Sequence, residues 1–210
     1  DGFVITVLFW IVLSVSGSIP FILFGFGVVD SFFESMSGIT TTGATVIAGL
    51  DDLPKSLLIY RQLLQWLGGM GLIVLAIAVM PLLGIGGGQL FKTQTPGPMS
   101  EQRLTPRITS TARALWSIYF VLTVLCIFAY RLAGMSYFDA VSHAFSTVSI
   151  GGFSTHDLSI GFFDSLSIEI VCITFMLLSA MSFAVHYSAI YRKQVLKYFY
   201  DPELRFFVSL

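Results

Sequence analysis

The chain has 210 residues, of which 55% are hydrophobic and 11% are charged, whereas about 25% of the residues of an ordinary soluble domain are charged. This composition is typical of a membrane protein. The net charge of -1 excludes nucleic acid as an expected partner, because proteins that bind it concentrate Lys and Arg against the phosphates. Cys126 and Cys172 lie in apolar runs without His or Cys at ligand spacing, so neither a zinc site nor a disulfide framework is expected.

Four stretches are long and apolar enough to cross a bilayer as helices, which takes about 20 residues. They are Phe3–Gly27, Leu57–Leu83, Ala112–Ala133 and Leu166–Tyr191. The first is too long for a signal peptide and lacks its cleavage features. We therefore expect an all-α membrane protein surrounded by membrane lipid.

The positions of Lys and Arg predict the orientation, because positively charged loops stay in the cytoplasm. All of the 11 basic residues except Lys55, Arg61 and Arg131 fall on one side. The segments Val28–Ser56 and Met135–Ser165 are therefore predicted to face outward. They carry most of the acidic residues, namely Asp30, Glu34, Asp51, Asp52, Asp139, Asp157 and Asp164.

The two halves of the chain repeat each other at an offset of 109 residues, without a gap around the outer segments. The offset pairs Gly43 with Gly152, Gly25 with Gly134, Asp30 with Asp139, Ser37 with Ser146 and Thr40 with Ser149. Each half consists of a span, an outer segment and a second span. Because two spans return the chain to its starting side, both halves have the same orientation, and the tandem repeat is parallel.

Each outer segment opens with a short helical pattern, VVDSFFESMSGI (Val28–Ile39) in the first half and SYFDAVSHAFSTV (Ser136–Val148) in the second. These helices are too short to span, but an apolar face predicts that they are buried. We interpret each as a re-entrant pore helix followed by an extended loop. Non-helical backbone at membrane depth is tolerated where it is buried in protein or lines a water-filled cavity.

The polar loops that follow these helices suit a small, hard cation. The C-terminal end of a helix carries a partial negative charge, and an extended loop can replace an ion's water shell with carbonyl oxygens where glycine permits the required backbone angles. Glycine occurs at 43, 151 and 152, and hydroxyl groups occur at Thr40, Thr41, Thr42 and Ser149. The outer acidic residues would raise the local cation concentration.

These loops carry a resemblance. The pattern of span, pore helix, TTTGATV and span resembles one quarter of a potassium channel filter. SGITTTGATVI (Ser37–Ile47) paired with STVSIGGFSTHD (Ser146–Asp157) resembles the TrkH and KtrB superfamily of potassium transporters, and TrkH most closely. Two further matches, GGGQLFKTQTPGP (Gly86–Pro98) and YDPELRFF (Tyr200–Phe207), extend the resemblance over essentially the whole chain.

The resemblance implies a potassium-binding selectivity filter in which potassium, the transported ion, is the only bound metal. Its first strand would be Thr41, Thr42 and Gly43, and its second strand Ile150, Gly151 and Gly152. Ala44 and Phe153 after the key glycines, and Ile150 in place of threonine, depart from a true potassium channel. We therefore expect weaker discrimination between potassium and sodium.

The resemblance also implies partners and a location. In that superfamily four such repeats of one polypeptide surround a single pore, each chain forms a homodimer, and a cytoplasmic nucleotide-binding regulatory subunit, TrkA in the TrkH systems, controls it. This chain holds two repeats, so the remaining two are expected from the same polypeptide. The expected location is the bacterial inner membrane.

The predicted organisation has four parts. Residues 1–83 form the first pore repeat, 84–111 a cytoplasmic linker, 112–191 the second repeat, and 192–210 a cytoplasmic connector with the start of a truncated third repeat. The predicted function is channel-like potassium translocation gated by the cytoplasmic partner. The alternative is a secondary cation symporter with alternating access. An enzyme is not expected, because no nucleophile, base or metal-ligand constellation occurs in the spans.

Four features allow a plain structural interpretation beside a functional one. GGMG (Gly68–Gly71) is predicted to serve close helix packing rather than to act as a hinge. His143 is predicted to pack or hydrogen-bond rather than to sense protons. His156 and Asp157 fit either the outer mouth of a pore or an exposed polar turn, and His186 is assigned no role.

Overall fold

The structure is a computed structural model that describes residues 2–79, 104–191, 193–194, 196–200 and 202–209. The predicted linker motif Gly86–Pro98 lies outside the described residues. The described part is helical and contains no β-strand. Its helices are α1 (Gly2–Leu23), α2 (Val28–Ile39), η1 (Leu50–Asp52), α3 (Lys55–Val79), α5 (Leu104–Leu132), α6 (Tyr137–Ser149), η3 (Ser159–Phe163), α7 (Leu166–Ala180), α8 (Phe183–Tyr191), α9 (Lys197–Tyr200) and α10 (Pro202–Ser209).

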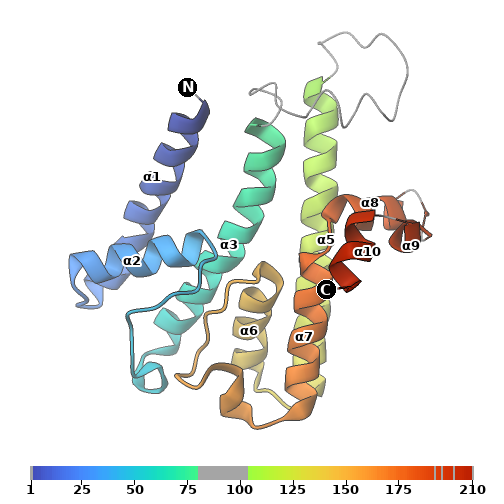
Figure 1. Cartoon of the computed structure of the whole chain (residues 1–210). Helices are drawn as coiled ribbons and strands as arrows, with labels where there is room; N and C mark the ends of the chain where they lie inside the picture. The colour runs from blue at the N-terminus through green and yellow to red at the C-terminus, as the bar shows by residue number, and fades with distance from the viewer. Residues whose placement is uncertain (1, 80–103, 192, 195, 201, 210) are drawn as a thin grey trace.

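Three long helices, α1, α3 and α5, stand upright in Figure 1. Among the described residues, α1 and α5 are by themselves long and apolar enough to cross a membrane. Large apolar side chains cover their outer faces, among them Val12 and Phe128, which are about 60% exposed. Such a face suits lipid better than water, which agrees with the first and third predicted spans. α5 begins at Leu104, inside the stretch predicted as linker.

The second predicted span forms the helix α3, which has 25 residues. Its first half contains Arg61, Gln62 and Gln65, all fully buried. α3 lies against both α2 and α6. Its polar side chains are therefore enclosed by protein rather than exposed to lipid.

The fourth predicted span is wrong as a single straight helix. It consists of α7 and α8, which are bent by 91° at the break, and only as a bent pair do they meet the length and apolarity of a span. The bend is visible where α8 turns away from the top of α7 (Figure 1). At the break the backbone of Met181 is extended, so the helix ends there and a new one begins at Phe183.

The backbone confirms the parallel repeat. Gly25 and Gly134, which the offset of 109 residues pairs, both have positive φ, +99° and +110°. The hydrogen bond from Gly25 N to Ile22 O is matched by the bond from Gly134 N to Arg131 O. No heavy atom lies within 4 Å of a Cβ built on either glycine, so these turns require glycine for its backbone angles. Both predicted pore helices, α2 and α6, follow directly.

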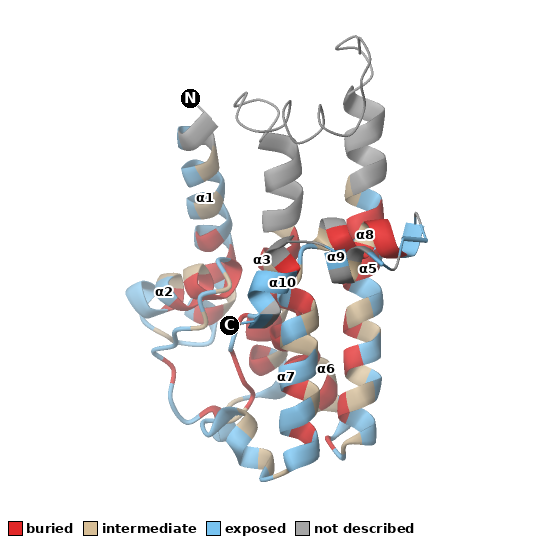
Figure 2. Ribbon diagram, turned by 45° about the vertical axis from the view of Figure 1, so that its right-hand side comes forward, coloured by how far each residue is buried: buried red, intermediate tan, exposed pale blue. Residues whose placement is uncertain are grey.

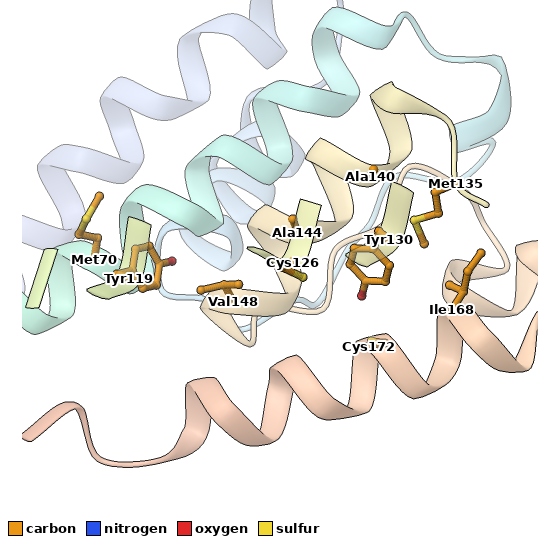
Figure 3. Packing of buried hydrophobic residues seen from close by; sticks show 10 residues of the cluster. All are labelled: Met70, Tyr119, Cys126, Tyr130, Met135, Ala140, Ala144, Val148, Ile168 and Cys172. Carbon is orange, nitrogen blue, oxygen red and sulfur yellow. The ribbon is translucent and has the colours of Figure 1, made fainter. Parts of the chain in front are cut away.

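Two apolar clusters hold the repeats. The larger joins α5, α6 and α7 and receives one buried residue, Met70, from α3, whose Trp66 also packs against it. Its buried members, shown in Figure 3, are Met70, Tyr119, Cys126, Tyr130, Met135, Ala140, Ala144, Val148, Ile168 and Cys172. Both cysteines are free thiols within this cluster. They pack as small apolar side chains, as the sequence predicts.

Glycines in α3 let the two pore helices approach it closely. A Cβ at Gly68 would overlap the backbone of Ile39, the last residue of α2, and a Cβ at Gly69 would come within 3.0 Å of Ser149 Cβ, at the end of α6. The GGMG motif therefore serves packing, as predicted. Figure 2 shows this junction as a concentration of buried residues where α3 passes α2 and α6.

Replacing Gly68 with alanine should destabilise the protein, whereas replacing Gly71 should not. At Gly68 the methyl group meets backbone that cannot rotate away, and such overpacking costs about 3 kcal/mol. At Gly71 no described atom beyond its own stretch of helix lies within 4 Å of the methyl position, and alanine favours a helix by up to about 1 kcal/mol relative to glycine. Thermal unfolding of the two purified variants in detergent measures the difference. Equal melting temperatures would contradict the packing role of Gly68.

Candidate functional site

The two predicted filter loops have the same backbone course. Thr41 and Ile150 both have φ of +55°, and the paired glycines, Gly43 and Gly152, have φ of +78° and +86°. Thr42 N donates to Ser37 O at 2.9 Å, and in the second repeat Gly151 N donates to Ser146 O at 2.8 Å. The structure thus places all six predicted residues in two equivalent turns, each at the C-terminal end of a pore helix.

The C-terminal ends of α2 and α6 bring partial negative charge to these turns. Beyond α2, the Thr40 hydroxyl lies 2.8 Å from the Thr42 hydroxyl and donates to Met36 O at 2.7 Å. Thr42 and Gly152 are exposed, Thr41 and Gly43 are half-buried, and Gly151 is buried. The first turn therefore carries two hydroxyl groups on exposed residues, Thr40 and Thr42. Hydroxyl and carbonyl oxygens are ligands suited to a hard monovalent cation.

The two loops meet at their glycines. A Cβ at Gly43 would overlap the carbonyl oxygen of Gly151, and the Cα of Gly43 is 3.9 Å from the position of a Cβ at Gly152. Residues 109 positions apart in the chain thus form one continuous wall. Position 43 requires glycine for two reasons: its φ is positive, and the Gly151 carbonyl oxygen lies where a side chain would begin.

A buried ion pair links the two loops just beyond the glycines. Arg61 Nε donates to Glu34 Oε1 at 2.7 Å, and both side chains are fully buried. Arg61 also donates to the Thr45 hydroxyl and to the Ser154 carbonyl, each at 3.0 Å. The offset of 109 residues pairs Thr45 with Ser154. One guanidinium from the first repeat therefore holds equivalent positions of both loops, and it also lies over the ring of Phe153 at 4.4 Å.

The pore helices contact the loops through equivalent residues of different chemistry. In the first repeat the Thr45 hydroxyl donates to Glu34, and in the second, Ser154 bonds His143 Nε2 at 2.9 Å. His143 Nδ1 lies 2.9 Å from Asp139 O, and because a carbonyl only accepts, Nδ1 carries the proton and Nε2 accepts from Ser154. His143 is a buried hydrogen-bonding residue, as predicted from the sequence.

The loops are joined again at their outer end. The Asp157 carboxylate accepts hydrogen bonds from Gly49 N at 3.1 Å and Leu50 N at 3.0 Å. His156 stacks on Phe162, with ring centroids 3.5 Å apart, and its Nδ1 contacts the Asp51 carboxylate. The hydrogen bond from His156 lowers the pKa of Asp51 below its usual value of 3.8, so Asp51 stays ionised at physiological pH. His156 and Asp157 connect the repeats rather than forming a free turn.

A family model described as TrkH, cation transport protein, matches residues 1–210. The chain belongs to this TrkH family. It is 57% identical over 209 residues to the Trk system potassium uptake protein TrkH of Halomonas elongata, a match that covers 98% of the chain and 43% of that protein. It is 50% identical over 213 residues to TrkH of Escherichia coli strain K12, covering 100% of the chain and 44% of the relative.

The fold agrees with this membership. The crystal structure of the potassium transporter TrkH from Vibrio parahaemolyticus matches with a TM-score of 0.85 and 52% identity, over 100% of this chain and 42% of that one. The chain therefore spans less than half the length of these TrkH relatives. The resemblance recognised in the filter motifs is confirmed, and so is the fold class, an all-α membrane protein with potassium-channel-like repeats.

Glu34 and Arg61 lie at the centre of this TrkH-family site. The predictions of Glu34 as an outer acidic residue and of Arg61 as an outer basic residue are wrong. Both are fully buried, so the pair contributes nothing to an outer negative field. A signal was present, because Arg61, Gln62 and Gln65 interrupt the predicted span Leu57–Leu83, and ionisable groups at membrane depth are costly unless they are paired.

Proposed function

We propose that the two loops form part of a selectivity filter through which potassium crosses the membrane, in a channel-like manner. Thr41, Thr42 and Gly43 would form one wall, and Ile150, Gly151 and Gly152 the next. The observation that carries the proposal is the pair of equivalent turns, with matching positive φ at Gly43 and Gly152, packed against each other at the ends of two pore helices. Relatives that share 50% to 57% of the residues are named potassium uptake proteins.

The proposed pore has four repeats, of which this chain contains two. Support comes from an uncovered apolar face on α7, where Ile170, Ile173 and Leu177 are about half exposed. α3 and α7 begin with equivalent hydrogen bonds, Leu57 N to Pro54 O and Ile168 N to Ser165 O, so the repeat offset is 111 residues here. It pairs this face with Ile59, Gln62 and Trp66 of α3. In α3, Trp66 of that face packs against Phe145 of α6, the pore helix of the next repeat. A third repeat on α7 would continue the same arrangement.

We further propose the organisation that the TrkH resemblance implies. The complete protein would be a homodimer in the bacterial inner membrane, gated by a cytoplasmic nucleotide-binding subunit of the TrkA kind. Residues 1–83 and 112–191 would be the two pore repeats, with 84–111 as a cytoplasmic linker and 192–210 leading to a third repeat. Membrane lipid would contact the apolar outer faces of α1 and α5.

Ion flux through the complete protein in liposomes tests the proposal. We expect potassium and rubidium to enter down their own gradients, in preference to sodium, in the absence of any sodium or proton gradient. None of the six proposed filter residues has an ionisable side chain. They offer only carbonyl and hydroxyl oxygens as ligands, and such ligands are sufficient for potassium selectivity. Flux that requires a sodium or proton gradient would favour the symporter instead. Absence of potassium flux would contradict both.

A further inference from the structure

Gln65 of α3 makes two hydrogen bonds to the backbone of the second filter loop. Its Nε2 donates to Gly151 O at 2.7 Å, and its Oε1 accepts from Phe153 N at 3.1 Å. The side chain is fully buried. The amide orientation follows from its partners, because the reverse orientation would place two acceptors and two donors against each other.

These bonds hold the Gly151 carbonyl on the inner side of the filter wall. Gly151 is buried, while its neighbours Ile150 and Gly152 are exposed. A carbonyl bonded to a buried amide faces the protein rather than the exposed surface of the loop. The equivalent residue of the first loop is Thr42, which is exposed, and none of the described residues donates a hydrogen bond to its carbonyl. The two loops therefore differ in whether the protein binds the carbonyl group at this position.

The glutamine that holds the Gly151 carbonyl occurs in the first repeat only. The offset of 111 residues between α3 and α7 pairs Gln65 with Met176, so the second repeat lacks the amide. Gly151 also leaves no room for a side chain, because a Cβ there would overlap the Gln65 amide. The glycine and the glutamine therefore fit each other across the two repeats.

We propose that Gln65 is a positioning residue that sets the ion selectivity of the filter by holding the Gly151 carbonyl behind the second loop. The proposal rests on the proposed function of these loops as a potassium filter. Discrimination between potassium and sodium requires ligand oxygens at defined positions. Without the two bonds, the glycine-containing segment from Ile150 to Phe153 can adapt its oxygens to the smaller sodium ion.

Methionine in place of Gln65 removes both hydrogen bonds and keeps an unbranched side chain of similar length. Gln62 is the matched control, because it is fully buried on the same helix and neither of its amide atoms has a hydrogen-bond partner among the described residues. In the complete protein in liposomes, Gln65→Met should lower the ratio of potassium to sodium flux about tenfold, which corresponds to the loss of about one net hydrogen bond. Gln62→Met should leave the ratio unchanged.

Melting temperatures of both variants separate a selectivity effect from unfolding. If Gln65→Met does not fold, Gln65→Glu is measured in the same way, since it retains the shape of the side chain and the acceptor for Phe153 N. An unchanged flux ratio in whichever variant folds overturns the proposal. If the wild-type protein carries no potassium, both the proposed function and the role of Gln65 are overturned. If the wild type is selective and the Gln65 variant is equally selective, only the role of Gln65 is overturned.

Discussion

Alanine in place of Gly43 is expected to abolish potassium flux through the complete protein, whereas alanine in place of Gly152 should reduce flux and selectivity but retain both. Each substitution pays about 1–2 kcal/mol for a left-handed backbone, since φ is +78° at Gly43 and +86° at Gly152. At Gly43 the methyl group would in addition overlap the Gly151 carbonyl, which the buried Gln65 holds in place. At Gly152 the methyl group would lie 3.9 Å from the Cα of Gly43, an ordinary van der Waals contact.

Rubidium and sodium flux into liposomes would measure both variants, with Gly49→Ala as the control. Gly49 also has a positive φ, +74°, and open space where a methyl group would lie, so alanine there has the same backbone cost without contacting the proposed filter residues. Gly49→Ala should transport as the wild type does. Normal selectivity in folded Gly43→Ala protein would refute the placement of Gly43 in the filter wall.

Removing either member of the Arg61 and Glu34 pair is expected to destabilise the protein by about 3–5 kcal/mol, because the remaining charge would be buried without a partner. Arg61→Met additionally leaves the Ser154 carbonyl without its guanidinium donor and separates the two filter loops. The double variant Arg61→Met with Glu34→Leu removes both charges. It should be more stable than either single variant, since no unpaired charge remains.

Arg131→Met serves as the control for loss of an arginine. Arg131 is exposed at the end of α5, where its guanidinium lies 4.2 Å from the centre of the Tyr137 ring, and its loss should cost about 1 kcal/mol or less. Thermal unfolding in detergent, followed by size-exclusion chromatography, compares the four variants. A double variant less stable than both single variants would show that Arg61 and Glu34 stabilise the loops independently rather than as a pair.

The local elements were predictable because their signals are local. The apolar run of the first span and the short amphipathic patterns of the pore helices led to α1, α2 and α6 within a few residues of their observed ends. The offset of 109 residues was predictable too, since Gly25 and Gly134 mark the same left-handed turn in each repeat. The break between α7 and α8 was not, because the apolar composition runs through it without Pro or Gly between Ala180 and Phe183.

What the sequence by itself determined is the family and the repeat, and it also suggested the six proposed filter positions, because glycine and threonine in a loop between two spans leave a pattern that can be read along the chain. Only the tertiary structure decided what stands behind those loops. Glu34, Arg61 and Gln65 meet residues 11 to 93 positions away, and a side chain's partner at such a distance depends on how helices pack rather than on its neighbours in sequence. A charged residue fits the sequence equally well on an outer surface and in a buried ion pair. Only its burial in the folded protein distinguishes the two cases.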